Sequence, residues 1–254
     1  MMNRVEFTRL PTLDYACEEA INTLCTNLSF SGENVKKIMI TSCHAAEGKS
    51  FLSMNIMRTM AKFGKSVVLV DADLRRSVIN AKYALQFSDP ERKYGLAHYL
   101  AGKAAEGDVI YSTDIDGAYM VPVGRVVSNP LPLLNTQRFE RLLDDLSQQA
   151  DYVLVDAPPV GTVIDGAQIA KSCDGTLIVV NYNTVRRQEL IDVKEQIEQT
   201  GCPILGAVLN MVEYDSYLSK KYYYKYYYSK YEYYGNESHS GGQASKKSGK
   251  DRKP

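Results

Sequence analysis

The segment Ala45-Ala46-Glu47-Gly48-Lys49-Ser50 separates an apolar run at residues 37–41 from an amphipathic stretch at residues 51–63. This order predicts a strand, a tight loop and a helix. A Gly-Lys-Ser sequence at such a junction suits a phosphate chain, because backbone N–H groups and the positive end of the helix face the anion. The pattern places Lys49 at the outer phosphates and makes the Ser50 hydroxyl a ligand for Mg²⁺.

The loop departs from the full phosphate-binding pattern at one position. The pattern has a glycine five residues before Gly48, where this chain has Cys43. A Gly-Lys-Ser turn without a ligand is therefore the alternative. Cys43 itself has two interpretations, a thiol activated near a helix start or a small residue that fits the loop. We expect the second.

Length and composition bound the function. The chain has 254 residues, 44% of them apolar, which suits one sizeable domain or two small ones. Its 30 basic and 30 acidic side chains cancel, so net charge gives no indication of nucleic acid or of an anionic membrane. No apolar run approaches the roughly 18 residues of a membrane span. The start lacks the order of a signal peptide, and the five cysteines have no metal spacing, so we expect reduced thiols in a cytosolic protein.

Apolar strands alternate with amphipathic helices along the chain. Residues 14–29 are predicted as a helix capped by Asp14, and Leu52, Ile56, Met60 and Phe63 are expected to pack on the sheet. The pattern predicts an α/β fold, a doubly wound and mostly parallel sheet with helices on both faces. The predicted strands are residues 37–41, 66–70, 118–123, 151–156, 175–181 and 203–210, and the further helices are residues 94–100, 136–149 and 184–199.

Three carboxylates follow predicted strands. Asp71 and Asp73 come after residues 66–70, and Asp156 ends residues 151–156. In open α/β sheets the carboxyl ends of the strands face the ligand crevice. We expect one of the first pair to hold Mg²⁺ through water and the other to take a proton, with a solvated turn as the alternative. Asp156 is expected to order Mg²⁺ or its water.

The composition changes after Val212. We predict a flexible tail at residues 213–254, after an N-terminal helical segment at residues 1–36 and a nucleotide-binding domain at residues 37–212. Tyrosines alternating with lysines also suit stacking on single-stranded nucleic acid or self-association, but nothing in the core supports a nucleic-acid partner. The tail holds nine clustered tyrosines: Tyr222, Tyr223, Tyr224, Tyr226, Tyr227, Tyr228, Tyr231, Tyr233 and Tyr234.

Together these stretches resemble the bacterial tyrosine kinases (BY-kinases) of capsule and exopolysaccharide synthesis, in the split form whose kinase is a separate polypeptide. Residues 41–50 look like the Walker A segment of this P-loop family, residues 70–76 like its Walker A′ motif and residues 153–159 like its Walker B motif. The tyrosine cluster lies where the family places its autophosphorylation sites. This tail distinguishes the kinases from their relatives, the partition and division-site ATPases.

The resemblance implies roles for individual residues. Lys49 would hold the nucleotide phosphates, Ser50 the Mg²⁺, and Asp73 with Asp156 the metal and its waters. Asp71 is the candidate acceptor of the tyrosine proton, and Asn210 looks like the residue that reads adenine. Arg75 and Arg76 are expected to contact phosphate or a neighbouring subunit. The implied nucleotide loop comprises Ala45, Ala46, Glu47, Gly48, Lys49, Ser50 and Phe51.

Three positions depart from the family pattern. The family has Pro-Gly where this chain has Ala45-Ala46, so we expect strain at Ala46 and weaker nucleotide binding. Asn22 and Cys25 stand where the family carries two arginines of a ring contact; the resemblance implies a homo-oligomer but leaves that contact open. Ser77 replaces a proline after the acidic motif.

The implied function is an ATP- and Mg²⁺-dependent tyrosine autokinase that phosphorylates its tail in trans and regulates polysaccharide synthesis and export. The tail carries four lysines and Glu232 between Lys220 and Tyr234, a net charge of +3, and is expected to enter an acidic site of a neighbour. Implied partners are a transmembrane activator, which brings the cytoplasmic chain to the inner face of the membrane, and a tyrosine phosphatase. The alternatives are a ParA- or MinD-like ATPase switch that positions a membrane complex, and a scaffold with a degenerate nucleotide site.

Overall fold

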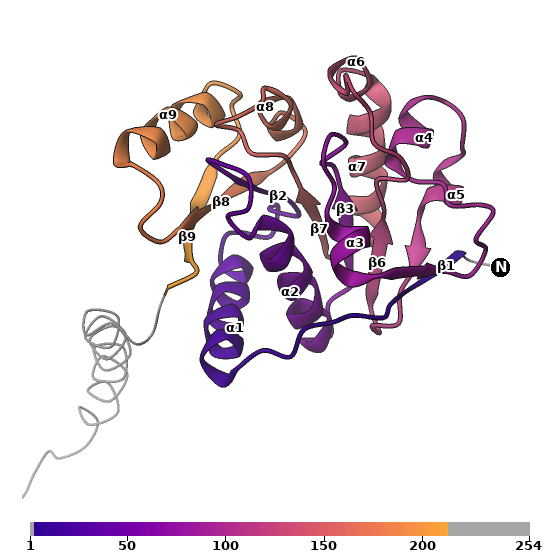
Figure 1. Ribbon diagram of the computed structural model, residues 1–254, viewed down its shortest axis with the longest axis horizontal. Coiled ribbons are helices and arrows are strands. Elements are labelled where there is room, and N and C mark those ends of the chain that lie inside the picture. Colours follow the sequence, from indigo (N-terminus) through magenta and orange to yellow (C-terminus); the bar gives the residue numbers. More distant parts are fainter. Residues whose placement is uncertain (1–2, 213–254) are drawn as a thin grey trace, which may run out of the picture. The chain divides into compact units, whose positions relative to one another are not determined.

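The computed structural model describes residues 3–212, which form a sheet covered by helices (Figure 1). The tyrosine-rich tail lies outside the described residues. Within them, no helix combines the length and the apolar character that crossing a bilayer requires. The strands are β1 Asn3–Phe7, β2 Lys37–Ser42, β3 Val67–Asp71, β4 Leu85–Phe87, β5 Tyr111–Ser112, β6 Ala118–Val121, β7 Tyr152–Asp156, β8 Gly175–Asn181 and β9 Ile204–Asn210. The helices are α1 Tyr15–Ser29, α2 Lys49–Lys62, α3 Ile79–Tyr83, α4 Leu96–Leu100, α5 Glu106–Val109, α6 Leu131–Leu134, α7 Gln137–Gln149, α8 Asp165–Ala170 and α9 Arg187–Glu198.

The described strands form one sheet in the order β4-β1-β5-β6-β3-β7-β2-β8-β9. From β6 to β9 every neighbouring pair is parallel. The antiparallel pairs, β1 with β4 and β5 with β6, lie at the other end of the sheet. The chain moves from β2 toward β3 and later returns through β7 to β8, on the opposite side of β2. The prediction of a doubly wound, mostly parallel sheet is confirmed.

Each central strand contributes to two cores, because successive side chains point to opposite faces. In β7, Val153 and Val155 belong to one core and Leu154 to the other. Helices α1, α2 and α3 cover the face of Leu154, whereas α4, α6, α7, α8 and α9 cover the opposite face (Figure 1). Continuous apolar strands therefore mark a sheet that is buried on both sides.

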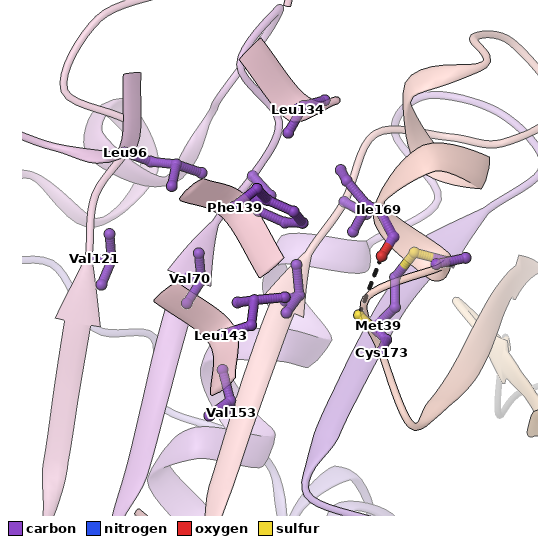
Figure 2. Close-up of a cluster of buried hydrophobic side chains, with 14 of the residues drawn as sticks. Met39, Val70, Leu96, Val121, Leu134, Phe139, Leu143, Val153, Ile169 and Cys173 are labelled. Atoms are coloured by element: carbon purple, nitrogen blue, oxygen red, sulfur yellow. Dashed lines mark hydrogen bonds between the residues drawn. The ribbon is translucent and has the colours of Figure 1, made fainter. Parts of the chain in front are cut away.

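The core beneath α7 shows why the predicted amphipathic helix packs as it does. Phe139 and Leu143 point from α7 toward Val70 of β3 and Val153 of β7 (Figure 2). All of these side chains are buried. Burial of one such side chain stabilises the fold by roughly 1.5–3 kcal/mol. This packing anchors β3 and β7, the strands whose carboxyl ends carry the acidic residues.

Two sequence expectations need correction. Phe63 was expected on the buried face of α2, but its side chain is 52% exposed because it is the C-cap residue, beyond the packed turns. The N-terminal residues, expected as a helical segment only, also contain β1, which joins the sheet beside β4 and β5. The predicted first helix is confirmed as Tyr15–Ser29, and the Asp14 carboxylate caps it by accepting a 2.7 Å hydrogen bond from the Cys17 N–H.

Candidate nucleotide site

The phosphate loop connects β2 to α2 through a left-handed glycine. Gly48 is the N-cap residue of α2, with φ of +92°, and it offers no side chain to the first N–H groups of the helix. Those donors are therefore available to an anion. A Cβ atom on Gly48 would lie 2.0 Å from Nδ2 of Asn210, so only glycine fits. The strand, loop and helix that the sequence predicted are present.

Ala46 has the conformation that a glycine would adopt at low cost. Its φ is +65°, in the left-handed region that is unfavourable for residues with a Cβ atom. The expected strain in the loop is thus present. Its effect on nucleotide affinity stays a prediction.

Glu47 and Asn210 brace the loop from inside the protein. The buried Glu47 carboxylate accepts a hydrogen bond of 2.9 Å from the His44 N–H and one of 3.5 Å from the Asn181 N–H of β8. The Asn210 side-chain amide donates to the Glu47 carbonyl oxygen at 2.9 Å. The Glu47 side chain therefore holds the loop, and any contact with a nucleotide falls to its backbone. That Asn210 reads adenine stays a prediction.

Two buried carboxylates face each other below the loop. Asp71 of β3 and Asp156 of β7 are register neighbours, and each is 1% exposed. Asp156 accepts hydrogen bonds from the hydroxyls of Ser50, at 2.6 Å, and Ser53, at 3.1 Å. The Ser77 hydroxyl donates to Oδ2 of Asp71. Oδ1 of Asp71 is the buried side-chain acceptor without a hydrogen bond among the described residues.

Burial raises the pKa of both carboxylates. Burial raises the pKa of Asp156 to about 6, against the lowering effects of the Ser50 hydrogen bond and the Lys49 ammonium. Burial and the neighbouring Asp156 raise the pKa of Asp71 well above its usual range. The hydrogen bonds and charges around the two buried carboxylates therefore do not fully offset the free-energy cost of burying their negative charge. A cation or a hydrogen-bond donor between them would lower that cost.

A pocket of about 890 Å³ opens over the loop. Its charged lining consists of Lys49, Arg75, Arg76, Lys82 and one acid, Asp73. Asp71 and Asp156 lie beneath this lining, which is therefore mainly basic. The acidic site expected for the tail stays a prediction. A basic pocket suits a polyanion. The remaining lining residues are Ala45, Ala46, Gly48, Ser50, Phe51, Val78, Val126, Val127, Ser128, Pro158, Pro159, Thr162, Val163 and Met211.

Of the two arginines, Arg75 is tied to the protein. Its guanidinium pairs through Nε and Nη2 with Asp165, which is 1% exposed at the start of α8, and its Nη1 donates to the Ser128 carbonyl at 3.2 Å. Arg76 is exposed, and its backbone N–H donates to Asp73 at 2.9 Å. The sequence reasoning missed Asp165, since no motif marks a carboxylate that meets its partner 90 residues away.

The residues present fit Mg²⁺ held together with phosphate. No group of three or more His, Cys, Asp or Glu side chains forms a metal cluster in residues 3–212. Mg²⁺ commonly takes only one or two carboxylates, with phosphate oxygens and waters completing its shell. The Ser50 hydroxyl, Asp156 and Asp73 are hard oxygen ligands of this kind, and the unpaired Oδ1 of Asp71 adds a nearby acceptor.

Cys43 is buried in the loop, and burial raises the pKa of its thiol to about 11. A thiol with a raised pKa is not activated as a nucleophile. The expectation of a small residue that fits the loop agrees with this environment.

Comparison with known proteins places this geometry in a family. A family model described as "AAA domain" matches residues 35–205. The tyrosine-protein kinase CpsD of Streptococcus agalactiae is 37% identical over 195 residues, covering 77% of this chain and 82% of that protein. The kinase domain of the Escherichia coli tyrosine kinase ETK has a TM-score of 0.73 and 32% identity, covering 78% of this chain and 77% of that chain.

A more distant structure shares only the fold. The septum site-determining protein MinD of Pyrococcus horikoshii, complexed with Mg-ADP, has a TM-score of 0.58 and 22% identity, covering 69% of this chain and 70% of that chain. The sequence matches, in contrast, extend through the phosphate loop and the strands that carry Asp71 and Asp156. The chain therefore belongs to the bacterial tyrosine-protein kinase family, which is built on the P-loop ATPase fold.

Proposed function

We propose that this protein-tyrosine kinase transfers the terminal phosphoryl group of ATP, with Mg²⁺, to the tail tyrosines of a second copy of the chain. One observation carries the proposal. Lys49, Ser50 and the carboxylates Asp71 and Asp156 meet at the ends of three neighbouring parallel strands, under a basic pocket. This is the constellation that phosphoryl transfer needs, since positioning and charge neutralisation supply most of its rate.

Different groups of the chain bind the phosphates and the metal ion. The first N–H groups of α2 and the Lys49 ammonium bind phosphate oxygens. Ser50, fixed by its hydrogen bond to Asp156, and Asp73 at the pocket wall would hold Mg²⁺. When bound, the metal supplies charge neutralisation at the phosphates. Apolar residues, among them Pro158 and Val163, form part of the pocket lining beside these charged groups.

Asp71 is the proposed acceptor of the tyrosine proton. A tyrosine hydroxyl has a pKa near 10, so transfer at neutral pH needs a base or a close cation. Oδ1 of Asp71 has no hydrogen bond among the described residues, and the raised pKa makes this carboxylate a stronger base than an ordinary aspartate. A base is most effective when its pKa approaches the working pH.

The control of this activity is proposed to lie with a membrane partner. The resemblance to the split kinases implies a transmembrane activator that recruits the cytoplasmic kinase to the inner face of the membrane, a role in polysaccharide export, and a phosphatase that resets the tail. The left-handed Ala46 supports a loop that is costly to hold without help. A partner that binds better with ATP must raise ATP affinity by the same factor. Calorimetric titration of ATP with and without the activator's cytoplasmic peptide tests this; equal affinities would exclude the coupling.

The test of the proposed function is direct. The purified chain is incubated with Mg·ATP, and phosphotyrosine is mapped by mass spectrometry while ATP hydrolysis is followed in parallel. Phosphate on the tyrosines of residues 222–234 is the expected result. Hydrolysis without phosphotyrosine would indicate a MinD-like switch, and neither activity, with ATP bound, would indicate a scaffold.

A further inference from the structure

The short helix α3 is tied to the start of the phosphate-binding helix. Ile79 and Tyr83 of α3 are fully buried, and the Tyr83 hydroxyl donates to the Ser50 carbonyl oxygen at 3.2 Å. Figure 1 shows α3 beside α2. Two buried side chains and this hydrogen bond fix α3. Lys82, one of the three exposed residues between Ile79 and Tyr83, therefore has a defined place relative to Ser50.

Two aromatic rings hold the Lys82 ammonium at the pocket. Nζ lies 5.2 Å from the ring centroid of Phe51 and 5.7 Å from that of Tyr83, within the range of a cation–π interaction. Phe51 directly follows Ser50, and both residues line the same pocket as Lys82. The rings therefore hold the charge of the exposed Lys82 beside the phosphate loop.

The electrostatic surroundings of Lys82 lack a matching anion. Burial lowers the pKa of Lys82, while the negative charge of Asp156 acts in the opposite direction. Within the part of the chain that the structure describes, Lys82 forms no salt bridge, in contrast to Arg75, which pairs with Asp165. Lys49, Arg76 and Lys82 thus gather positive charge around one pocket that has a single acidic lining residue, Asp73. Like charges brought together in this way favour a polyanionic ligand.

From these contacts we infer that Lys82 is a second nucleotide-binding lysine, whose ammonium contacts the phosphate chain of the nucleotide near Lys49. The inference rests on the proposed nucleotide site and adds a residue to it. Phe51 has a corresponding role, since its ring positions the ammonium. The ligand chemistry is that of a nucleoside polyphosphate, whose oxygens accept charge-assisted hydrogen bonds from an ammonium group.

The test compares matched lysine variants in calorimetric titrations with Mg·ATP and with Mg·ADP. Lys82→Met is expected to weaken binding of at least one nucleotide by about 10- to 150-fold, the usual effect of losing a hydrogen bond to a charged group. Lys82→Arg keeps the positive charge and the capacity for a cation–π contact, and is expected to bind nucleotide more tightly than Lys82→Met. Lys62→Met, an exposed lysine of α2 outside the pocket, is the control.

Phe51→Leu provides an independent arm, because it keeps apolar volume and removes the ring. A loss of about two- to fivefold in affinity is expected from the missing cation–π contact. Unfolding midpoints without nucleotide verify that each variant is folded. If Lys82→Met binds both nucleotides as tightly as Lys62→Met, Lys82 does not contact the nucleotide, while the proposed nucleotide site still stands. A folded wild-type chain that binds neither nucleotide would overturn the site itself, and Lys82 with it.

Discussion

Ala46 offers a quantitative test of the strained phosphate loop. Its φ of +65° costs a residue with a Cβ atom roughly 1–2 kcal/mol relative to glycine. Replacing alanine by glycine also lowers stability by roughly 0.5–1 kcal/mol, because the unfolded chain gains freedom. Ala46→Gly is therefore expected to be neutral or stabilising, although most substitutions destabilise a protein. The side chain is exposed, so its removal loses little packing.

The neighbouring alanine is a matched control. Ala45 is also exposed in the same turn, but its φ is not positive. Ala45→Gly therefore increases the conformational freedom of the unfolded chain, which lowers stability, without relieving backbone strain in the folded protein. The free energy of unfolding of Ala46→Gly is expected to exceed that of Ala45→Gly by roughly 1–2 kcal/mol. Urea denaturation of both variants, with equal m-values, measures this difference. If the two variants are equally stable, or if Ala45→Gly is the more stable, the strain argument is refuted.

Four other variants test the charged residues around the site. Asp71→Asn is expected to slow tyrosine phosphorylation by about 100-fold or more, while the Kd for ATP changes less than about threefold. The reason is that a proton acceptor acts on the chemical step. Phosphorylation at the wild-type rate would show that Asp71 is not the proton acceptor. Without Mg²⁺, the folded protein keeps the Asp156 proton up to a pH of about 6, whereas the unfolded chain releases it near 3.8. The free energy of unfolding should therefore fall by about 3 kcal/mol as the pH rises through that window. Urea unfolding of Asp156→Asn should not show this pH-dependent decrease. The same dependence of stability on pH in Asp156→Asn and the wild type would contradict the raised pKa. Arg75→Met leaves Asp165 buried and unpaired. It is expected to cost about 3 kcal/mol, the lower end for a broken buried pair because Arg75 is itself partly exposed, against less than about 0.5 kcal/mol for the exposed Arg76→Met. Equal urea midpoints would show that the ion pair contributes little.

The central fold could be predicted because its signals are local. The apolar run that forms β7 and the amphipathic pattern of α7 each specify an element without reference to the rest of the chain. Strand β1 could not be found in this way, because Val5 pairs with Phe87, which lies 82 positions away. The assignment of Phe63 to the buried face failed for a different reason: helical periodicity continued past the residue at which α2 ends.

In the candidate site, too, the residues with a local sequence signal could be predicted and those placed by tertiary contacts could not. Gly48, Lys49 and Ser50 are contiguous, and a strand followed by a helix fixes their geometry, so the motif identified them. Asp165 and Lys82 acquire their places only through tertiary contacts, with Arg75 and with the Phe51 ring. The sequence around a charged residue in a loop or a short helix has no periodic pattern that identifies its contact partner. Position in the folded chain therefore adds residues to the site that sequence patterns miss.

The most direct test of phosphoryl transfer between copies is a mixing experiment. Lys49→Met, carrying a mass tag, is incubated with Mg·ATP alone and together with the untagged wild-type chain, and phosphotyrosine is mapped on each copy. Lys49 lines the pocket, and circular dichroism verifies that the variant is folded. We expect no phosphotyrosine on Lys49→Met alone and phosphate on residues 222–234 of the tagged copy in the mixture. Labelling of folded Lys49→Met by itself, or a tagged copy that stays unmodified while the wild type is phosphorylated, would contradict this expectation.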